Sequence, residues 1–89
     1  MKYSVFLHPK AADFLRKIDS KLRRRIKGRL KELEDDPMNK GERLYGSPFY
    51  RLRIGDYRAI YTIDREKLMV IVLFIGHRRE VYDDFSRLL

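Results

Sequence analysis

The spacing of hydrophobic positions changes twice along this 89-residue chain. A short apolar run within residues 3–7 predicts a first strand. Between residues 10 and 35 the apolar residues recur every three or four positions, which is the spacing of an amphipathic helix. They are Leu15, Ile18, Leu22, Ile26, Leu30 and Leu33. From residue 49 onward, alternating and then continuous apolar runs favour strands. The pattern predicts an α+β fold with the element order β-α-α-β-β-β.

The helical region contains a break at Asp19-Ser20, and these residue types favour a helix N-cap. Pro9 suits the first turn of a helix. We therefore predict a helical hairpin with helices over about residues 10–18 and 20–35. One continuous helix is the alternative, because the apolar stripe keeps its phase through the break. Asp35-Asp36-Pro37 ends the helical region, and residues 37–48 are predicted to form a loop.

Residues 49–61 predict a β-hairpin around Gly55-Asp56. Glycine at the first central position of a two-residue loop suits a type II′ turn. That turn pairs Ile54 with Tyr57 and Arg53 with Arg58, and the pairs Leu52–Ala59 and Arg51–Ile60 follow. Because strand side chains alternate between faces, the predicted core face holds Tyr50, Leu52, Ile54, Tyr57, Ala59 and Tyr61. Arg51, Arg53 and Arg58 share the opposite face.

This arginine face is costly for a fold that has no ligand to bind. Like charges directly opposite each other on two strands destabilise a sheet, by up to roughly 1 kcal/mol a pair. Arginine is suited to phosphate because its planar guanidinium donates two parallel hydrogen bonds and keeps its charge. Arg51, Arg53 and Arg58 therefore predict an anion-binding site.

The stretch from Leu68 to Ile75 is entirely apolar, which is typical of a central strand covered on both faces. Its neighbours should be the second hairpin strand and the N-terminal strand, with both helices on one face of the sheet. The orientation of the N-terminal strand stays open. Residues 81–89 are expected to form a short helix or tail. We find no repeat or linker, so residues 1–89 are predicted to form one domain.

The charge of the chain favours a polyanionic partner. Twenty-one basic and 13 acidic residues give a net charge of +8, which points to RNA, DNA, a ribosome or an acidic protein. The basic residues are concentrated in the second predicted helix, where seven occur without an acidic one. They are Lys21, Arg23, Arg24, Arg25, Lys27, Arg29 and Lys31. One-signed blocks of this kind are usually interaction surfaces, so we predict that they contact phosphates.

The rest of the composition limits the chemistry and the cellular location that can be expected of the protein. The absence of cysteine excludes disulfides and thiolate chemistry. The longest apolar run, of eight residues, is too short to cross a bilayer, and we see no signal peptide, so a cytoplasmic protein without membrane contact is expected. A charged fraction of 38%, with no glutamine and a single asparagine, is typical of thermophilic proteins.

A second candidate site follows the central strand, in His77-Arg78-Arg79-Glu80-Val81-Tyr82. An imidazole has an unperturbed pKa suited to general acid–base chemistry near neutral pH. Arg78 could stabilise negative charge, and Tyr82 offers a hydroxyl and a ring on which a base can stack. The two histidines lack a nearby carboxylate cluster, so no metal site is predicted. No phosphate-binding glycine loop is present, so no cofactor is expected.

Three segments together resemble the RelE/ParE superfamily of toxins from toxin–antitoxin systems. They are Tyr50-Arg51-Leu52-Arg53, Gly55-Asp56-Tyr57-Arg58-Ala59-Ile60-Tyr61 and the segment from Gly76 to Tyr82. The resemblance covers nearly the whole chain. The second segment is shared by the mRNA-cleaving RelE branch and the gyrase-poisoning ParE branch, whereas the ending Glu-Val-Tyr favours RelE.

The resemblance implies a type II toxin that cleaves mRNA in the ribosomal A site. The ribose 2′-hydroxyl would attack the adjacent phosphate, without a metal. Arg58 and Arg78 match the family's phosphate-stabilising arginines, and Tyr82 matches its terminal catalytic tyrosine. The implied partners are a RelB-like antitoxin, mRNA on the ribosome, ribosomal RNA and, through the antitoxin, operator DNA.

The chain departs from the RelE pattern at Arg51 and Arg53, where that branch often has lysines. Arginine does not lose its proton in proteins, so the general base is not identified and activity could be reduced. His77 is the candidate for proton transfer, with Arg51, Arg53 and Arg79 binding phosphates. Two alternatives remain: a ParE-like gyrase poison without catalysis, and a nucleic-acid-binding subunit of an autorepressor.

Overall fold

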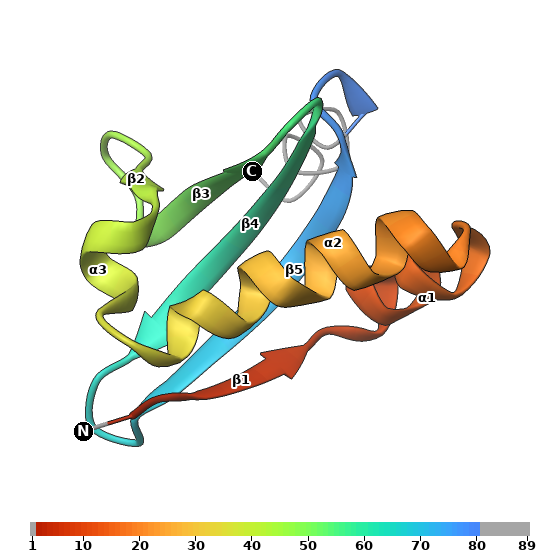
Figure 1. The fold of residues 1–89 in the computed structure, drawn as a ribbon. Coiled ribbons are helices and arrows are strands. Elements are labelled where there is room, and N and C mark those ends of the chain that lie inside the picture. Colours follow the sequence, from red (N-terminus) through yellow and green to blue (C-terminus); the bar gives the residue numbers. More distant parts are fainter. Residues whose placement is uncertain (1, 81–89) are drawn as a thin grey trace.

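Five strands form one sheet, and helices α1 and α2 lie across one of its faces (Figure 1). The computed structural model describes residues 2–80, so Tyr82 and the predicted helix or tail over 81–89 lie outside the described residues. The elements are β1 (Ser4–Leu7), α1 (Pro9–Lys17), α2 (Ser20–Lys31), the 3-10 helix η1 (Glu32–Glu34), α3 (Pro37–Lys40), β2 (Glu42–Arg43), β3 (Phe49–Ile54), β4 (Tyr57–Asp64) and β5 (Met69–His77).

The strand order is β1-β5-β4-β3-β2, and β5 is central as predicted. β1 runs parallel to β5, with Ser4 opposite Met69, whereas the other pairs of neighbours are antiparallel. Parallel neighbours need a long crossover connection. Here the connection from β1 to β5 is long, and it begins with α1 and α2, which lie over one face of the sheet. The orientation that the sequence left open is therefore parallel.

The prediction of a loop over residues 37–48 is wrong in part. Pro37 begins the four-residue helix α3, and Glu42 and Arg43 form β2, which pairs with β3 opposite Arg51 and Tyr50. Neither element is long enough to produce a hydrophobic period. Their formation depends on docking against β3 and Tyr61, which is a long-range effect that local sequence does not report.

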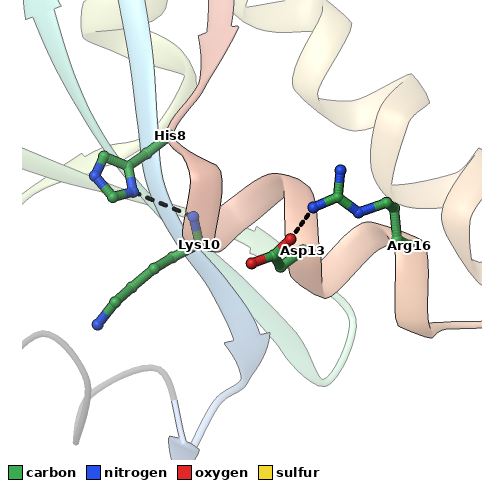
Figure 2. A network of polar contacts seen from close by, with 4 residues as sticks. All are labelled: His8, Lys10, Asp13 and Arg16. Atoms are coloured by element: carbon green, nitrogen blue, oxygen red, sulfur yellow. Dashed lines mark hydrogen bonds and ion pairs between the residues drawn. The ribbon is translucent and has the colours of Figure 1, made fainter.

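The predicted helical hairpin is confirmed, with α1 and α2 separated at residues 18–19. His8 caps α1, because its Nδ1 accepts a hydrogen bond of 3.2 Å from the backbone N–H of Lys10 (Figure 2). One turn further along, Asp13 and Arg16 form an exposed ion pair on the same helix. Side-chain caps satisfy backbone donors that a helix start leaves without partners.

Arg23 fastens the two helices together. The cap of α2 is Asp19, which accepts a hydrogen bond from the N–H of Leu22 at 2.9 Å. From the next turn, the Arg23 guanidinium donates to the carbonyl oxygens of Leu15 at 2.7 Å and Ile18 at 2.8 Å. These carbonyls belong to the end of α1, where helices leave acceptors without intrahelical partners.

We expect Arg23→Ala to lower the free energy of unfolding by about 2 kcal/mol, because hydrogen bonds from a charged donor contribute about 1.5–3 kcal/mol. Urea unfolding followed by circular dichroism measures this. Arg24→Ala is the matched control, since Arg24 is exposed on the same helix, and it should change stability by less than about 0.5 kcal/mol. Equal effects of the two substitutions would contradict the structural role of Arg23.

The main core lies between the helices and the sheet. It includes Leu15, Ile26, Leu30, Leu52, Ile54, Ala59, Tyr61, Val70, Val72 and Ile75. The predicted core face of the hairpin is thereby confirmed. Buried Tyr61 donates its hydroxyl to the carbonyl of Pro37 at 2.7 Å, and burial raises the pKa of that hydroxyl to about 12. A second, smaller cluster on the opposite face centres on Ile60 and Phe74.

Candidate nucleic-acid interface

The arginine hairpin has the predicted register. Ile54 lies opposite Tyr57, and Arg53 lies opposite Arg58. Gly55 has a φ of 61°, whereas Asp56 is not among the residues with positive φ. A type I′ turn would need positive φ at both positions, so the turn fits the predicted type II′.

Arg51, Arg53 and Arg58 lie on the sheet face opposite the helices. Strand alternation puts them on the same side as Ile60, which packs in the cluster on that face. The predicted grouping of these three arginines is therefore confirmed. Their surroundings differ, however, because Arg58 is only 9% exposed whereas Arg53 is exposed.

The guanidinium of Arg58 is held at the hairpin turn. Its Nη1 donates hydrogen bonds to the carbonyl oxygens of Gly55 at 2.6 Å and Tyr57 at 2.8 Å. The residue opposite Arg58 on β5 is Gly76, which is buried. A charged donor is thus positioned on the sheet face by the backbone of its own turn.

Arg51 forms an ion pair with Glu42 of β2. The hydrogen bond from Arg51 and its positive charge hold the pKa of the Glu42 carboxyl below its usual range. The sequence analysis missed Glu42 because β2 was not predicted. A carboxylate therefore already occupies one of the anion-binding groups of this face.

His77 is separated from the hairpin arginines by the sheet. It lies opposite Tyr57, and the two rings make an edge contact with centroids 5.8 Å apart. The ring of Tyr57 in turn packs against Phe14 of α1, with centroids 6.0 Å apart. His77 therefore belongs to the helix-covered face, and the structure does not bring it together with Arg58.

Arg78 and Arg79 follow β5 and are exposed. The backbone N–H of Arg78 donates to the carbonyl of Asp56 at 2.9 Å. This hydrogen bond extends the strand pairing to the hairpin turn and brings the Arg78 backbone next to the segment that holds Arg58. The position of Tyr82, the fourth predicted catalytic residue, lies outside the described residues.

The seven basic residues of α2 divide into two groups. Arg23, Arg25 and Arg29 each reach another part of the protein, although Arg25 is exposed: Arg23 caps α1, the Arg25 guanidinium lies against Gly55, and Arg29 donates to the carbonyl of Arg53 at 3.0 Å. Exposed positions three or four residues apart share one face of a helix. Lys21, Arg24, Lys27 and Lys31 have this spacing and are exposed, so they form the outward basic stripe.

Metal-binding clusters and membrane-spanning helices were both sought among the described residues. Residues 2–80 contain no group of three or more His, Asp or Glu side chains placed to hold a metal ion. Over the same residues, no helix has the length and apolar character needed to cross a membrane.

Comparison with known proteins identifies relatives with this fold. Residues 5–82 match the family model described as the ParE toxin of the type II toxin–antitoxin system parDE. The chain is 32% identical to the mRNA interferase toxin RelE of Escherichia coli K12 over 89 residues, which covers 94% of each protein. Both relationships extend over most of the chain, beyond the hairpin segments alone.

Solved structures agree with this relationship. A free-state arginine-to-alanine mutant of E. coli toxin RelE superposes with a TM-score of 0.80 at 32% identity, covering 100% of both chains. The toxin–antitoxin complex RelBE2 of Mycobacterium tuberculosis gives a TM-score of 0.77 at 26% identity, covering 88% of this chain and 93% of the other. The archaeal RelE–RelB complex of Pyrococcus horikoshii gives a TM-score of 0.75 at 27% identity, covering 88% of this chain and 97% of the other. The chain therefore belongs to the RelE/ParE family of type II toxin–antitoxin toxins.

Proposed function

We propose that this toxin is a ribosome-dependent mRNA endonuclease that cleaves in the A site. The observation that carries the proposal is the arginine face, in which Arg53 and Arg58 lie directly opposite each other beside Arg51. Arginines this close together are stabilised when they bind phosphate. The names of the E. coli and Shigella flexneri relatives as mRNA interferases support the same activity.

In the proposed reaction, the ribose 2′-hydroxyl attacks the adjacent phosphorus and the 5′-oxygen leaves. The products are a 2′,3′-cyclic phosphate and a 5′-hydroxyl. Negative charge develops on the phosphoryl oxygens in the transition state, and positioned cations stabilise it more than they stabilise the ground state. Arg58 and Arg78 would supply these cations without a metal, while Arg51, Arg53 and Arg79 bind the phosphates and Tyr82 orients the substrate.

Arg58 must rearrange to take this role. Its Nη1 donates to two backbone carbonyls, so phosphate binding would exchange at least part of this hydrogen bonding for bonds to phosphoryl oxygens. A phosphoryl oxygen that carries negative charge is a stronger hydrogen-bond acceptor than a neutral carbonyl oxygen. The exchange is therefore favourable when substrate is present, and the carbonyls keep the guanidinium ordered when it is absent.

The sheet between His77 and Arg58 weakens the case for His77 as the proton-transfer group. We expect His77→Ala to keep the rate of cleavage within about tenfold of wild type, below the 10²–10⁴-fold contribution typical of general acid–base catalysis. Single-turnover cleavage on programmed ribosomes measures this rate. A loss of two or more orders of magnitude, with the fold intact, would assign proton transfer to His77 after all.

The outward stripe of α2 is proposed to dock on ribosomal RNA in the cytoplasm. It holds Lys21, Arg24, Lys27 and Lys31. The cognate partner is proposed to be a RelB-like antitoxin, as in the complexes from M. tuberculosis and P. horikoshii. An antitoxin that covers the arginine face would inhibit the toxin, and the pair could bind operator DNA together.

The test is to add the purified protein to ribosomes programmed with a defined mRNA and to map the new RNA ends by primer extension. Cuts at the A-site codon, absent without ribosomes, are the expected result. An intact message in the presence of folded protein would overturn the proposal. A 2′-deoxy substitution at the cut nucleotide should abolish the cut, because it removes the attacking hydroxyl.

The family model that matches residues 5–82 is described as a ParE toxin, and this favours gyrase inhibition as the second candidate function. In that case the arginines would contact gyrase without doing chemistry. A DNA supercoiling assay separates the two functions. Inhibition of gyrase together with an uncut message would replace the nuclease by the gyrase poison.

A further inference from the structure

A hollow at the edge of the sheet gathers four basic side chains. It has a volume of about 310 Å³ and lies where the end of α2, the end of α3 and strands β2 and β3 meet. Its lining consists of Arg29, Lys40, Gly41, Glu42, Arg51 and Arg53. Four cations and one carboxylate leave an excess of positive charge in a small space, which favours an anionic ligand.

The basic side chains of the hollow are differently engaged. Arg29 is fixed by an ion pair with Glu32 at 2.8 Å and by its hydrogen bond to the Arg53 carbonyl. Within residues 2–80, the structure records no hydrogen bond or ion pair for the Lys40 ammonium group. Among the described residues, Lys40 therefore keeps its donors for a ligand, whereas Arg29 already donates to Glu32 and to the Arg53 carbonyl.

Among the described residues, Glu42 is the one anionic group that lines the hollow. Its carboxylate forms an ion pair with Arg51, and the Glu42 side chain is 65% exposed whereas that of Arg51 is 23% exposed. A carboxylate on a guanidinium makes the same kind of charge-assisted hydrogen bonding that a phosphate makes. Glu42 thus stands where a phosphoryl group could bind, and it can swing into solvent when it is displaced.

Arg53 connects the hollow to the proposed catalytic face. It lines the hollow and lies directly opposite Arg58 on β4. Paired residues on antiparallel strands have Cα atoms about 4.5–5.5 Å apart. An extended anionic chain could therefore place one group at Arg58 and its neighbour in the hollow.

We propose that this hollow binds the backbone phosphate next to the scissile phosphate on the same RNA strand, with Lys40 as its principal new contact. The proposal rests on the proposed nuclease function, because it takes RNA as the ligand. In the absence of RNA, Glu42 holds Arg51 and lowers its attraction for phosphate. RNA binding displaces the Glu42 carboxylate.

The experiment measures binding of a fluorescent single-stranded RNA hexamer, in which every 2′-hydroxyl is methylated to prevent cleavage, by anisotropy at several salt concentrations. Lys40→Gln should weaken binding about three- to tenfold. It should also reduce the slope of log K against log salt by about 0.7, the value for one phosphate contact on a single strand. Glu42→Gln should have the opposite effect on affinity and tighten RNA binding about two- to fivefold.

Lys67→Gln is the matched control, because Lys67 is an exposed lysine in the turn between β4 and β5. It should bind the hexamer within twofold of wild type. Equal binding by Lys40→Gln and Lys67→Gln, unchanged or weaker binding by Glu42→Gln, or no measurable binding by wild type at low salt would each overturn the proposal. Since the hexamer cannot be cut and no ribosome is present, failure here is distinguishable from failure of the nuclease function.

Discussion

Arg58→Ala is expected to lower the rate of mRNA cleavage on the ribosome at least 100-fold. Loss of one positioned donor to a developing oxyanion typically costs about 10²–10³ in rate, and Arg58 is held on the arginine face by the backbone of its own turn. The measurement is single-turnover cleavage of a defined message, with the RNA ends mapped by primer extension. The rate of the chemical step should fall, while the proposed binding of α2 to the ribosome should be retained.

Two further variants make this result specific. Arg58→Lys keeps the charge but loses the planar fork, so its rate should lie between those of wild type and Arg58→Ala. Arg65→Ala removes an exposed arginine from the turn between β4 and β5 and should cleave like wild type. Arg58→Ala could also loosen its turn, so thermal unfolding is measured in parallel. Wild-type cleavage by a folded Arg58→Ala would remove Arg58 from the mechanism.

The arginine face could be predicted because its causes are local. A turn glycine, two alternating runs and the period of a strand define the register between Arg53 and Arg58, and the structure has that register. The helical hairpin is local in the same sense, since the apolar stripe and the capping residue Asp19 lie within one segment. A helix or hairpin that is specified by residues close together in the sequence can be predicted without knowledge of the fold.

The face on which His77 lies depends on a long-range detail. Tyr61 pairs with Val72 whereas Ile60 pairs with Phe74, so β5 carries one extra residue at this point. A β-bulge shifts the alternation of the strand beyond it, which moves His77 to the helix-covered face beside Tyr57. A continuous apolar run contains no signal for such a bulge, and for this reason the sequence could not separate His77 from the arginines.

The hollow could not be predicted from the sequence either. Lys40 and Glu42 lie in the segment that was predicted to be a loop, and they reach Arg51 and Arg53 only because β2 pairs with β3. The charge of these residues was known from composition, but their convergence on one site is a property of the tertiary structure.

Gly41→Ala is expected to destabilise the fold by about 3 kcal/mol, because the segment between α3 and β2 has no space for a side chain. A Cβ atom at this position would lie 2.4 Å from the Tyr61 hydroxyl oxygen and 2.7 Å from the Arg51 carbonyl oxygen. Overpacking of this kind costs about 1–3 kcal/mol. Displacing Tyr61 also threatens its hydrogen bond to Pro37, and a buried group without its partner costs about 1–3 kcal/mol more.

Gly28→Ala is the control, and its effect on stability should be opposite to that of Gly41→Ala. A Cβ atom at Gly28 of α2 meets nothing within 4 Å, and alanine is favoured over glycine in a helix by about 1 kcal/mol, so this variant should be more stable than wild type. Urea unfolding at neutral pH measures both. If Gly41→Ala instead unfolded like wild type, α3 and β2 would not be docked closely on Tyr61. The hollow that depends on this docking would then lose Lys40 and Glu42 from its lining.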